Sequence, residues 1–149
     1  MLNILIPVDG SEPSLQAVHH ALQLVGAGLK ARFVVANVQE TANLYELVVA
    51  HDPGVLQKVS EEAGYDLMRL AVKFLQAAGQ QVVQDVSTGD PAHMLVEVIE
   101  RQGCDAVIMS ARGAGLRAVV MGSVSQEMVQ ASPVPVTLVK AHPESTPRD

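Results

Sequence analysis

Glycine and serine residues stand between a strand-like run and a helix-like run near the end of the chain. An apolar run at 106–110 is followed by Gly113 and then, after eight residues, by the triplet Gly122-Ser123-Val124. The short apolar run is typical of a buried strand, and Ser123 is a good N-cap for a following helix. A glycine-bearing loop before a helix suits an anion, because backbone N–H groups point outward there and the helix dipole favours negative charge. The spacing therefore predicts a phosphate cradle.

The same glycines have a simpler interpretation, in which they only turn the chain and let a helix begin. The stretch 113–118 also fits a dinucleotide fingerprint with alanine in the last place. We discount that match, because the fingerprint belongs at the first strand-to-helix turn and requires an acidic residue about 20 positions later. A P-loop pattern is absent from the sequence.

Other side chains add little chemistry of their own. Arg112 and Arg117 flank Gly113 and suit phosphate, although a solvated surface arginine is the alternative role for either. The five histidines lack metal-site spacing, and Cys104 is expected to be a small buried residue rather than a nucleophile. No catalytic constellation is evident, which favours a binding protein over an enzyme.

Strand-like and helix-like segments alternate along the chain. Strands are expected at 3–8, 31–38, 81–86, 106–110 and 134–140. Helices are expected from Ser11-Glu12-Pro13 to Gly26, in a long segment ending near Gly79, from Asp90-Pro91, and at 123–131. This alternation predicts a parallel sheet with helices on both faces. The connection at 39–53 is unusually long and is expected to hold a short helix around 44–50.

Bulk properties restrict the class of protein. The 149 residues suit one domain, and because 48% of them are hydrophobic but only 3% aromatic, the core must be aliphatic. The net charge of −6 argues against a nucleic-acid surface, which requires a basic face. No apolar run is long enough for a membrane span, and the N-terminus lacks a signal-peptide pattern. We therefore expect a cytoplasmic protein without nucleic-acid or membrane partners.

Several stretches together resemble the universal stress protein family. The stretch 4–12 is similar to the family's opening strand and turn, 88–91 to its third strand-to-helix turn, and 132–139 to its closing strand. Gly113 and Gly122-Ser123 match the second glycine and the closing pair of the family's nucleotide motif. The chain departs from that motif in two respects: Ser110 replaces the first glycine, and the spacer before Gly122 has eight residues rather than nine.

The resemblance implies a doubly wound, open five-stranded parallel sheet of order 3-2-1-4-5, spanning residues 1–141. Residues 142–149 are polar with two prolines and are expected to form a flexible tail. Ligands bind such folds where the strand order reverses. The resemblance implies ATP or a related adenine nucleotide there, with Asp9 near the ribose and phosphates, holding nucleotide-bound Mg²⁺ or acting only as a helix-entry carboxylate. The implied nucleotide-binding residues are Pro7, Asp9, Val38, Met109, Ser110, Arg112, Gly113, Gly122, Ser123 and Val124.

Two further expectations follow from the resemblance. The last strand is expected to form a homodimer through Val136, Leu138 and Val139, because an exposed apolar edge invites pairing with another chain. The bound nucleotide is expected to act as a signal and to be hydrolysed slowly at most. The alternative is a nucleotide-free stress protein that works through dimerisation and protein partners.

Overall fold

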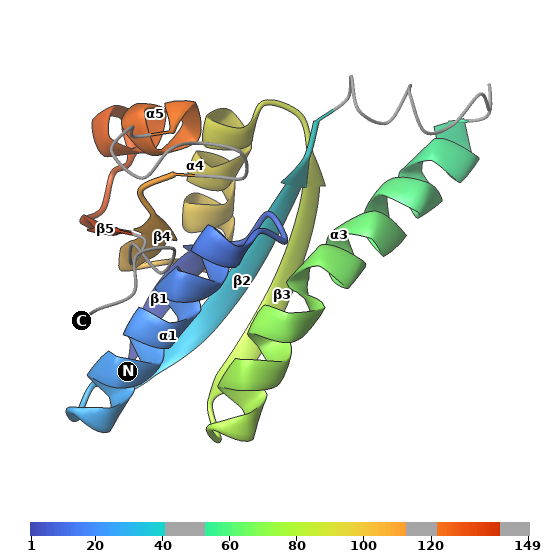
Figure 1. Cartoon of the computed structure of the whole chain (residues 1–149). Helices are drawn as coiled ribbons and strands as arrows, with labels where there is room; N and C mark the ends of the chain where they lie inside the picture. The colour runs from blue at the N-terminus through green and yellow to red at the C-terminus, as the bar shows by residue number, and fades with distance from the viewer. Residues whose placement is uncertain (41–52, 113–121, 141–149) are drawn as a thin grey trace, which may run out of the picture.

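The computed structural model describes residues 1–40, 53–112 and 122–140. Five parallel strands form one sheet in the order β3-β2-β1-β4-β5, which confirms the expected doubly wound α/β fold (Figure 1). The strands are β1 (Leu2–Pro7), β2 (Ala31–Gln39), β3 (Gln81–Thr88), β4 (Ala106–Ser110) and β5 (Val136–Val139). The helices in the described ranges are α1 (Glu12–Gly26), α3 (Pro53–Ala77), α4 (Pro91–Gln102) and α5 (Ser123–Ala131). Gly113, the helix expected around 44–50 and the tail at 142–149 lie outside the described residues.

Helices α1 and α3 cover one face of the sheet, and α4 and α5 cover the other. Each face has an aliphatic core with few large aromatic rings, and Phe33 on the α1/α3 face is fully buried. The middle parts of β1 and β2, at 4–6 and 33–36, are apolar and buried, which fits strands that are covered on both sides. Burial of these side chains supplies the main favourable free energy of folding.

Two helices begin as their sequences predict. Ser11 caps α1, and its side chain accepts a hydrogen bond from the backbone N–H of Ser14. Asp90 caps α4 by accepting from the N–H of His93 at 3.1 Å. Pro13 and Pro91 lie in the first turns, where a missing N–H costs nothing.

Strand β5 is shorter than expected, beginning at Val136 rather than Val134. Pro133 and Pro135 have no N–H to donate, so pairing with β4 starts when the carbonyl of Pro135 accepts from the N–H of Val107 at 2.9 Å. The edge strand is half-buried at Val136, Leu138 and Val139 and exposed at Thr137.

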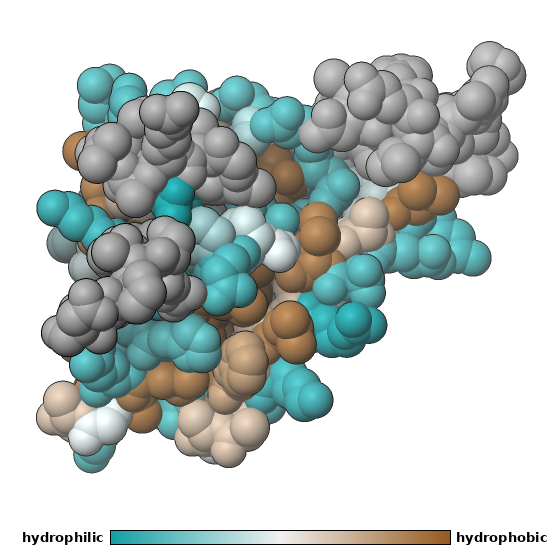
Figure 2. Space-filling view, in the orientation of Figure 1, coloured by the Kyte–Doolittle hydropathy of each residue, from teal (hydrophilic) through white to brown (hydrophobic). Residues whose placement is uncertain are grey.

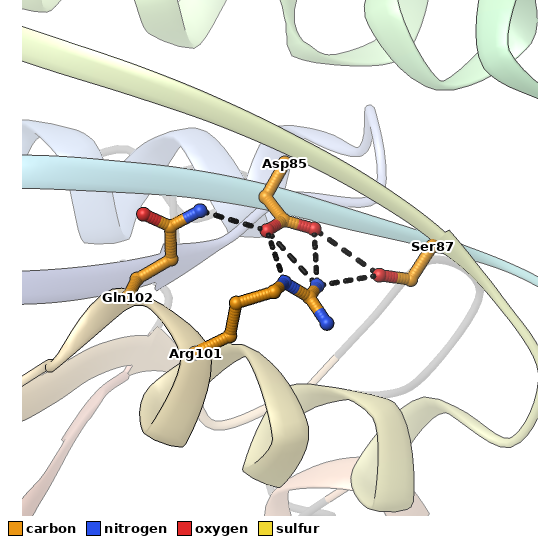
Figure 3. Close-up of polar contacts among 4 residues, drawn as sticks. All are labelled: Asp85, Ser87, Arg101 and Gln102. Atoms are coloured by element: carbon orange, nitrogen blue, oxygen red, sulfur yellow. Dashed lines mark hydrogen bonds and ion pairs between the residues drawn. The ribbon is translucent and has the colours of Figure 1, made fainter.

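An ion pair between the buried Asp85 and the half-exposed Arg101 holds the end of α4 against β3 (Figure 3). The carboxylate of Asp85 accepts from the guanidinium of Arg101, with Nη2 at 2.9 Å from Oδ1 and 3.0 Å from Oδ2. Ser87 and Gln102 donate to the same carboxylate, each at 3.1 Å. Asp85 is only 8% exposed, so these four contacts replace the water that the charge loses on burial.

Figure 2 shows apolar surface along the junction of α1 and α3. Helix α3 buries Met68, Ala71 and Leu75 against the sheet but leaves Leu70 and Phe74 partly exposed. The ring of Phe74 packs against His19 of α1 at a centroid distance of 5.3 Å. The apolar stripe of α3 is therefore wider than the face it packs against the sheet.

Candidate functional site

A cavity lies where the strand order reverses, between the carboxyl ends of β1 and β4. The two strands are neighbours in the sheet, but β1 leads to α1 on one face and β4 leads toward α5 on the other. This arrangement leaves a crevice at the strand ends. The cavity there measures about 150 Å³. It is lined by Pro7, Val8, Asp9, Ser14, Ala36, Asn37, Val38, Glu40, Pro91, Leu95, Met109, Ser110, Arg112, Val124 and Ser125.

The cavity brings together most of the site residues proposed from the sequence. Pro7, Asp9, Val38, Met109, Ser110, Arg112 and Val124 line it. Gly122 and Ser123 are at the start of α5, beside Val124, but are not among the lining residues. Gly113 is outside the described residues.

One wall of the cavity is apolar and continuous with the hydrophobic core under α4 and α5. Val38 from the end of β2, Leu95 from α4 and Met109 from β4 belong to that core and also line the cavity. Val124 from α5 extends the same wall. Such a surface suits the flat, weakly polar ring of a ligand.

Asp9 forms a tight turn at the mouth of the cavity. Its Oδ1 accepts from the backbone N–H of Ser11 at 2.9 Å and from the Ser11 hydroxyl. Both bonds use Oδ1, so they do not occupy Oδ2. Gly10 completes the turn with φ +82°, and a Cβ there would meet a Leu67 side-chain carbon at 2.4 Å. The positive φ favours glycine at this position, and any larger residue would also displace the Leu67 side chain.

The start of α5 differs from the sequence prediction in one respect. Helix α5 begins at Ser123 as expected, but its N-cap is Gly122, with no side-chain capping hydrogen bond. Gly122 has extended backbone and its carbonyl accepts from the N–H of Gln126 at 3.0 Å, which places Ser123 within the first turn. The prediction that Ser123 caps the helix is wrong, and the first-turn N–H groups of α5 have no side-chain acceptor at the N-cap.

Ser125 and Ser110 fix the N-terminus of α5 to the end of β4. The Ser125 hydroxyl donates to the carbonyl of Ala111 at 2.8 Å, and the N–H of Gly122 donates to the same carbonyl at 2.8 Å. The hydroxyl of Ser110 donates to the carbonyl of Arg112 and accepts from its N–H at 3.2 Å. The side chain that replaces the family motif's first glycine therefore closes a local turn.

Sequence reasoning missed Asn37, which joins the ends of β1 and β2 beside the cavity. Its Nδ2 donates to the carbonyl of Val8 at 2.8 Å, and its Oδ1 accepts from Gln39 at 2.5 Å. Asn37 is only 3% exposed. A single amide within a buried apolar strand was the available signal, because such a group must find partners.

Cys104 is buried, as expected, and it precedes β4 at the end of the sheet opposite the cavity. Burial raises the pKa of its thiol to about 11, although the positive charge of Arg32 opposes the shift. Within the ranges 1–40, 53–112 and 122–140, no group of three or more His, Cys, Asp or Glu side chains is placed to hold a metal ion. None of the helices in those ranges is long and apolar enough to cross a bilayer.

Known proteins share this arrangement of elements. The model of the universal stress protein family matches residues 1–140. Universal stress protein MJ0531 of Methanocaldococcus jannaschii is 26% identical over 138 residues, which cover 92% of this chain and 81% of that protein. The solved structure of MJ0577 superimposes with a TM-score of 0.78 at 25% identity, covering 95% of this chain and 96% of that one.

Two further solved relatives contain nucleotides. A universal stress protein in complex with cAMP has a TM-score of 0.63 at 24% identity, covering 93% of this chain and 95% of that one. A universal stress protein family member from Arabidopsis thaliana with AMP bound has a TM-score of 0.69 at 18% identity, covering 100% and 97%. The fold, the position of the crevice and the family match over residues 1–140 lead to one conclusion: the chain belongs to the universal stress protein family.

Proposed function

We propose that this protein binds an adenine nucleotide, such as AMP, cAMP or ATP, in the crevice between β1 and β4. The observation that carries the proposal is the meeting of two unlike surfaces at the switch point. The apolar wall of Val38, Leu95 and Met109 lies in the same cavity as Arg112 and the first turn of α5. A purine needs the first surface, and a phosphate needs the second. The relatives solved with cAMP and AMP support the proposal.

Each part of the ligand has a matching part of the crevice in this proposal. The base packs on the apolar wall, and the phosphate accepts hydrogen bonds from N–H groups at the start of α5, where the helix dipole adds attraction. Arg112 neutralises charge on the phosphate. Asp9 accepts from ribose hydroxyls through Oδ2, the oxygen that its turn leaves unoccupied.

Mg²⁺ fits the site as a companion of a nucleotide rather than as a resident ion. Asp9 offers one carboxylate oxygen, and Mg²⁺ characteristically uses one or two carboxylates together with phosphate oxygens and water. The described residues contain no carboxylate cluster that would hold the ion alone. Bound Mg²⁺ would neutralise part of the phosphate charge.

We infer a signalling role for the bound nucleotide, in a stress response in the cytoplasm. The described lining residues include no histidine or cysteine, and the hydroxyls of Ser14, Ser110 and Ser125 are bonded to backbone groups. Hydrolysis of the bound nucleotide is therefore expected to be slow compared with the turnover of an enzyme.

Calorimetric titration with AMP, cAMP and ATP tests the proposal. The key variant is Gly122→Val. The backbone at Gly122, with φ −67° and ψ 156°, is accessible to valine, and a β-branched side chain there would obstruct the approach of a phosphate to the first turn of α5. We expect at least about a tenfold loss of affinity, equivalent to about 1.4 kcal/mol.

Gly26→Val is the matched control. Gly26 ends α1, and a Cβ there meets no atom within 4 Å. The control should bind nucleotide like the wild type. Unchanged affinity in a folded Gly122→Val variant would contradict the assignment of α5, and no binding of any of the three nucleotides to the wild type would contradict the proposed function itself.

A second candidate function is supported by the edge strand β5. In the described part of the sheet, β5 pairs only with β4, and Val136, Leu138 and Val139 keep part of their apolar surface exposed. We propose that two copies pair through this strand, because an unpaired apolar edge favours association. A two-fold interface would use the same strand twice. Dimerisation is compatible with nucleotide binding and would also serve a nucleotide-free protein that acts through partners.

A further inference from the structure

Three serine side chains in the cavity wall direct their protons into the protein. Ser14, Ser110 and Ser125 line the cavity and are each less than 9% exposed. Each hydroxyl donates to a backbone carbonyl, at 2.8 Å for Ser14 and 2.8 Å for Ser125. The acceptors for Ser14, Ser110 and Ser125 are the carbonyls of Ser11, Arg112 and Ala111, respectively. A hydroxyl has one proton, so these groups present lone pairs to a ligand and attract its donors rather than its anionic oxygens.

The charged side chains around the cavity also disfavour a strongly anionic ligand. Asp9 and Glu40 both line it, and Arg112 is the one cation among its described lining residues. The whole chain carries a net charge of −6. A ligand with several phosphates would therefore bring more negative charge into a wall that already has more acidic than basic side chains.

Among the described residues at the start of α5, one backbone donor is already in use. The N–H of Gly122 is already bonded to the carbonyl of Ala111, which leaves later N–H groups of the first turn of α5 to bind an anion. The cavity of about 150 Å³ is smaller than the roughly 300–1,000 Å³ of pockets that enclose drug-sized ligands. The described walls thus have room and donors for a base and sugar with limited anionic charge.

We propose that this crevice selects adenine nucleotides with a single phosphate, and that it discriminates against ATP in the absence of a divalent cation. The inference rests on the proposed function and names its ligand class. Selection arises because the carboxylates of Asp9 and Glu40 repel additional phosphates. The hydroxyls of Ser14, Ser110 and Ser125 have already donated their protons to backbone carbonyls, so they can accept from the ribose but cannot donate to a phosphate.

Calorimetry at low ionic strength tests the selection, because screening of surface charges is weakest there. AMP and ATP are titrated in EDTA and again in excess Mg²⁺. We expect AMP to bind at least about tenfold more tightly than ATP in EDTA, and Mg²⁺ to narrow that ratio because it neutralises phosphate charge.

Charge variants identify the source of the selection. Glu40→Gln keeps the size of the side chain and removes one negative charge from the cavity wall, so it should raise the affinity for ATP by more than that for AMP. Glu100→Gln is the matched control, since Glu100 is an exposed acid of α4 that does not line the cavity. Glu100→Gln should leave the ratio of the affinities for AMP and ATP unchanged.

The outcomes separate this inference from the proposed function. ATP binding as tightly as AMP in EDTA would overturn the inference while leaving nucleotide binding intact. Equal effects of Glu40→Gln and Glu100→Gln on the ratio would overturn the role of the cavity wall. A wild type that binds neither AMP nor ATP would overturn the proposed function and this inference with it.

Discussion

Replacing Arg101 with methionine should destabilise the protein without removing its apolar side-chain stem. The substitution leaves the buried carboxylate of Asp85 with Ser87 and Gln102 as its remaining neutral donors. Removing one partner of a fully buried ion pair costs about 3–5 kcal/mol. The Arg101 side chain is 48% exposed, so water can reach the vacated position. We therefore expect Arg101→Met to lower the free energy of unfolding by about 2 kcal/mol, which is in the range of hydrogen bonds to a charged group.

Urea unfolding at pH 7 measures this loss. For a domain of this size, the free energy of unfolding typically falls by about 2 kcal/mol per M urea. The urea concentration at the midpoint of unfolding should therefore fall by about 1 M. Arg69→Met is the matched control, because Arg69 forms an ion pair with Asp66 at 3.2 Å in which both side chains are more than two-thirds exposed. Such a pair contributes about 0–1 kcal/mol.

A double-mutant cycle isolates the contact itself. In an Asp85→Asn background the carboxylate charge is gone, so Arg101→Met should cost clearly less there than in the wild type. The reasoning would be refuted if Arg101→Met and Arg69→Met shifted the midpoint equally, or if the cost of Arg101→Met were the same in both backgrounds.

Three other perturbations have defined outcomes. Asp9→Asn should weaken ATP binding more in Mg²⁺ than in EDTA, because only in Mg²⁺ does the lost carboxylate hold the metal; equal losses of affinity by calorimetry would contradict this metal role. Because burial raises the pKa of Cys104 from 9.0 to about 11, the thiol ionises at a lower pH in the unfolded protein than in the folded protein. The free energy of unfolding should therefore fall as pH rises from about 9 to 11, and fall less in Cys104→Ala; identical pH profiles in urea unfolding would contradict this. Leu138→Lys should shift the protein toward monomer in light scattering, and a wild type that is monomeric at micromolar concentration would exclude the β5 interface.

The sequence predicts the fold well because its local signals agree with one another. Ser11 with Pro13, and Asp90 with Pro91, start helices where the structure has them. The apolar runs that become β1, β2 and β4 are long enough to be recognised as buried strands. The strand order came from the family resemblance rather than from these signals, and the structure confirms it.

Local sequence does not encode the long-range contacts of the fold and of the site. Asp85 and Arg101 are 16 positions apart, and only the packing of α4 on β3 brings them together. The side chain of Asn37, on β2, donates to the carbonyl of Val8, which follows the neighbouring strand β1. The direction in which Ser110 and Ser125 donate depends on the folded turn after β4, so a sequence motif alone cannot say whether these hydroxyls serve a ligand or the backbone.

An NMR titration of uniformly ¹⁵N-labelled protein with AMP tests the central claim most directly. If the nucleotide binds in the crevice, the largest amide shifts should belong to Val38, Asp9 and Val124, which line it from three different elements. Amides of Gln76 and Ala77, at the far end of α3, should move little. Saturable shifts centred on the crevice are the predicted result, and an unchanged spectrum at millimolar AMP would contradict the account.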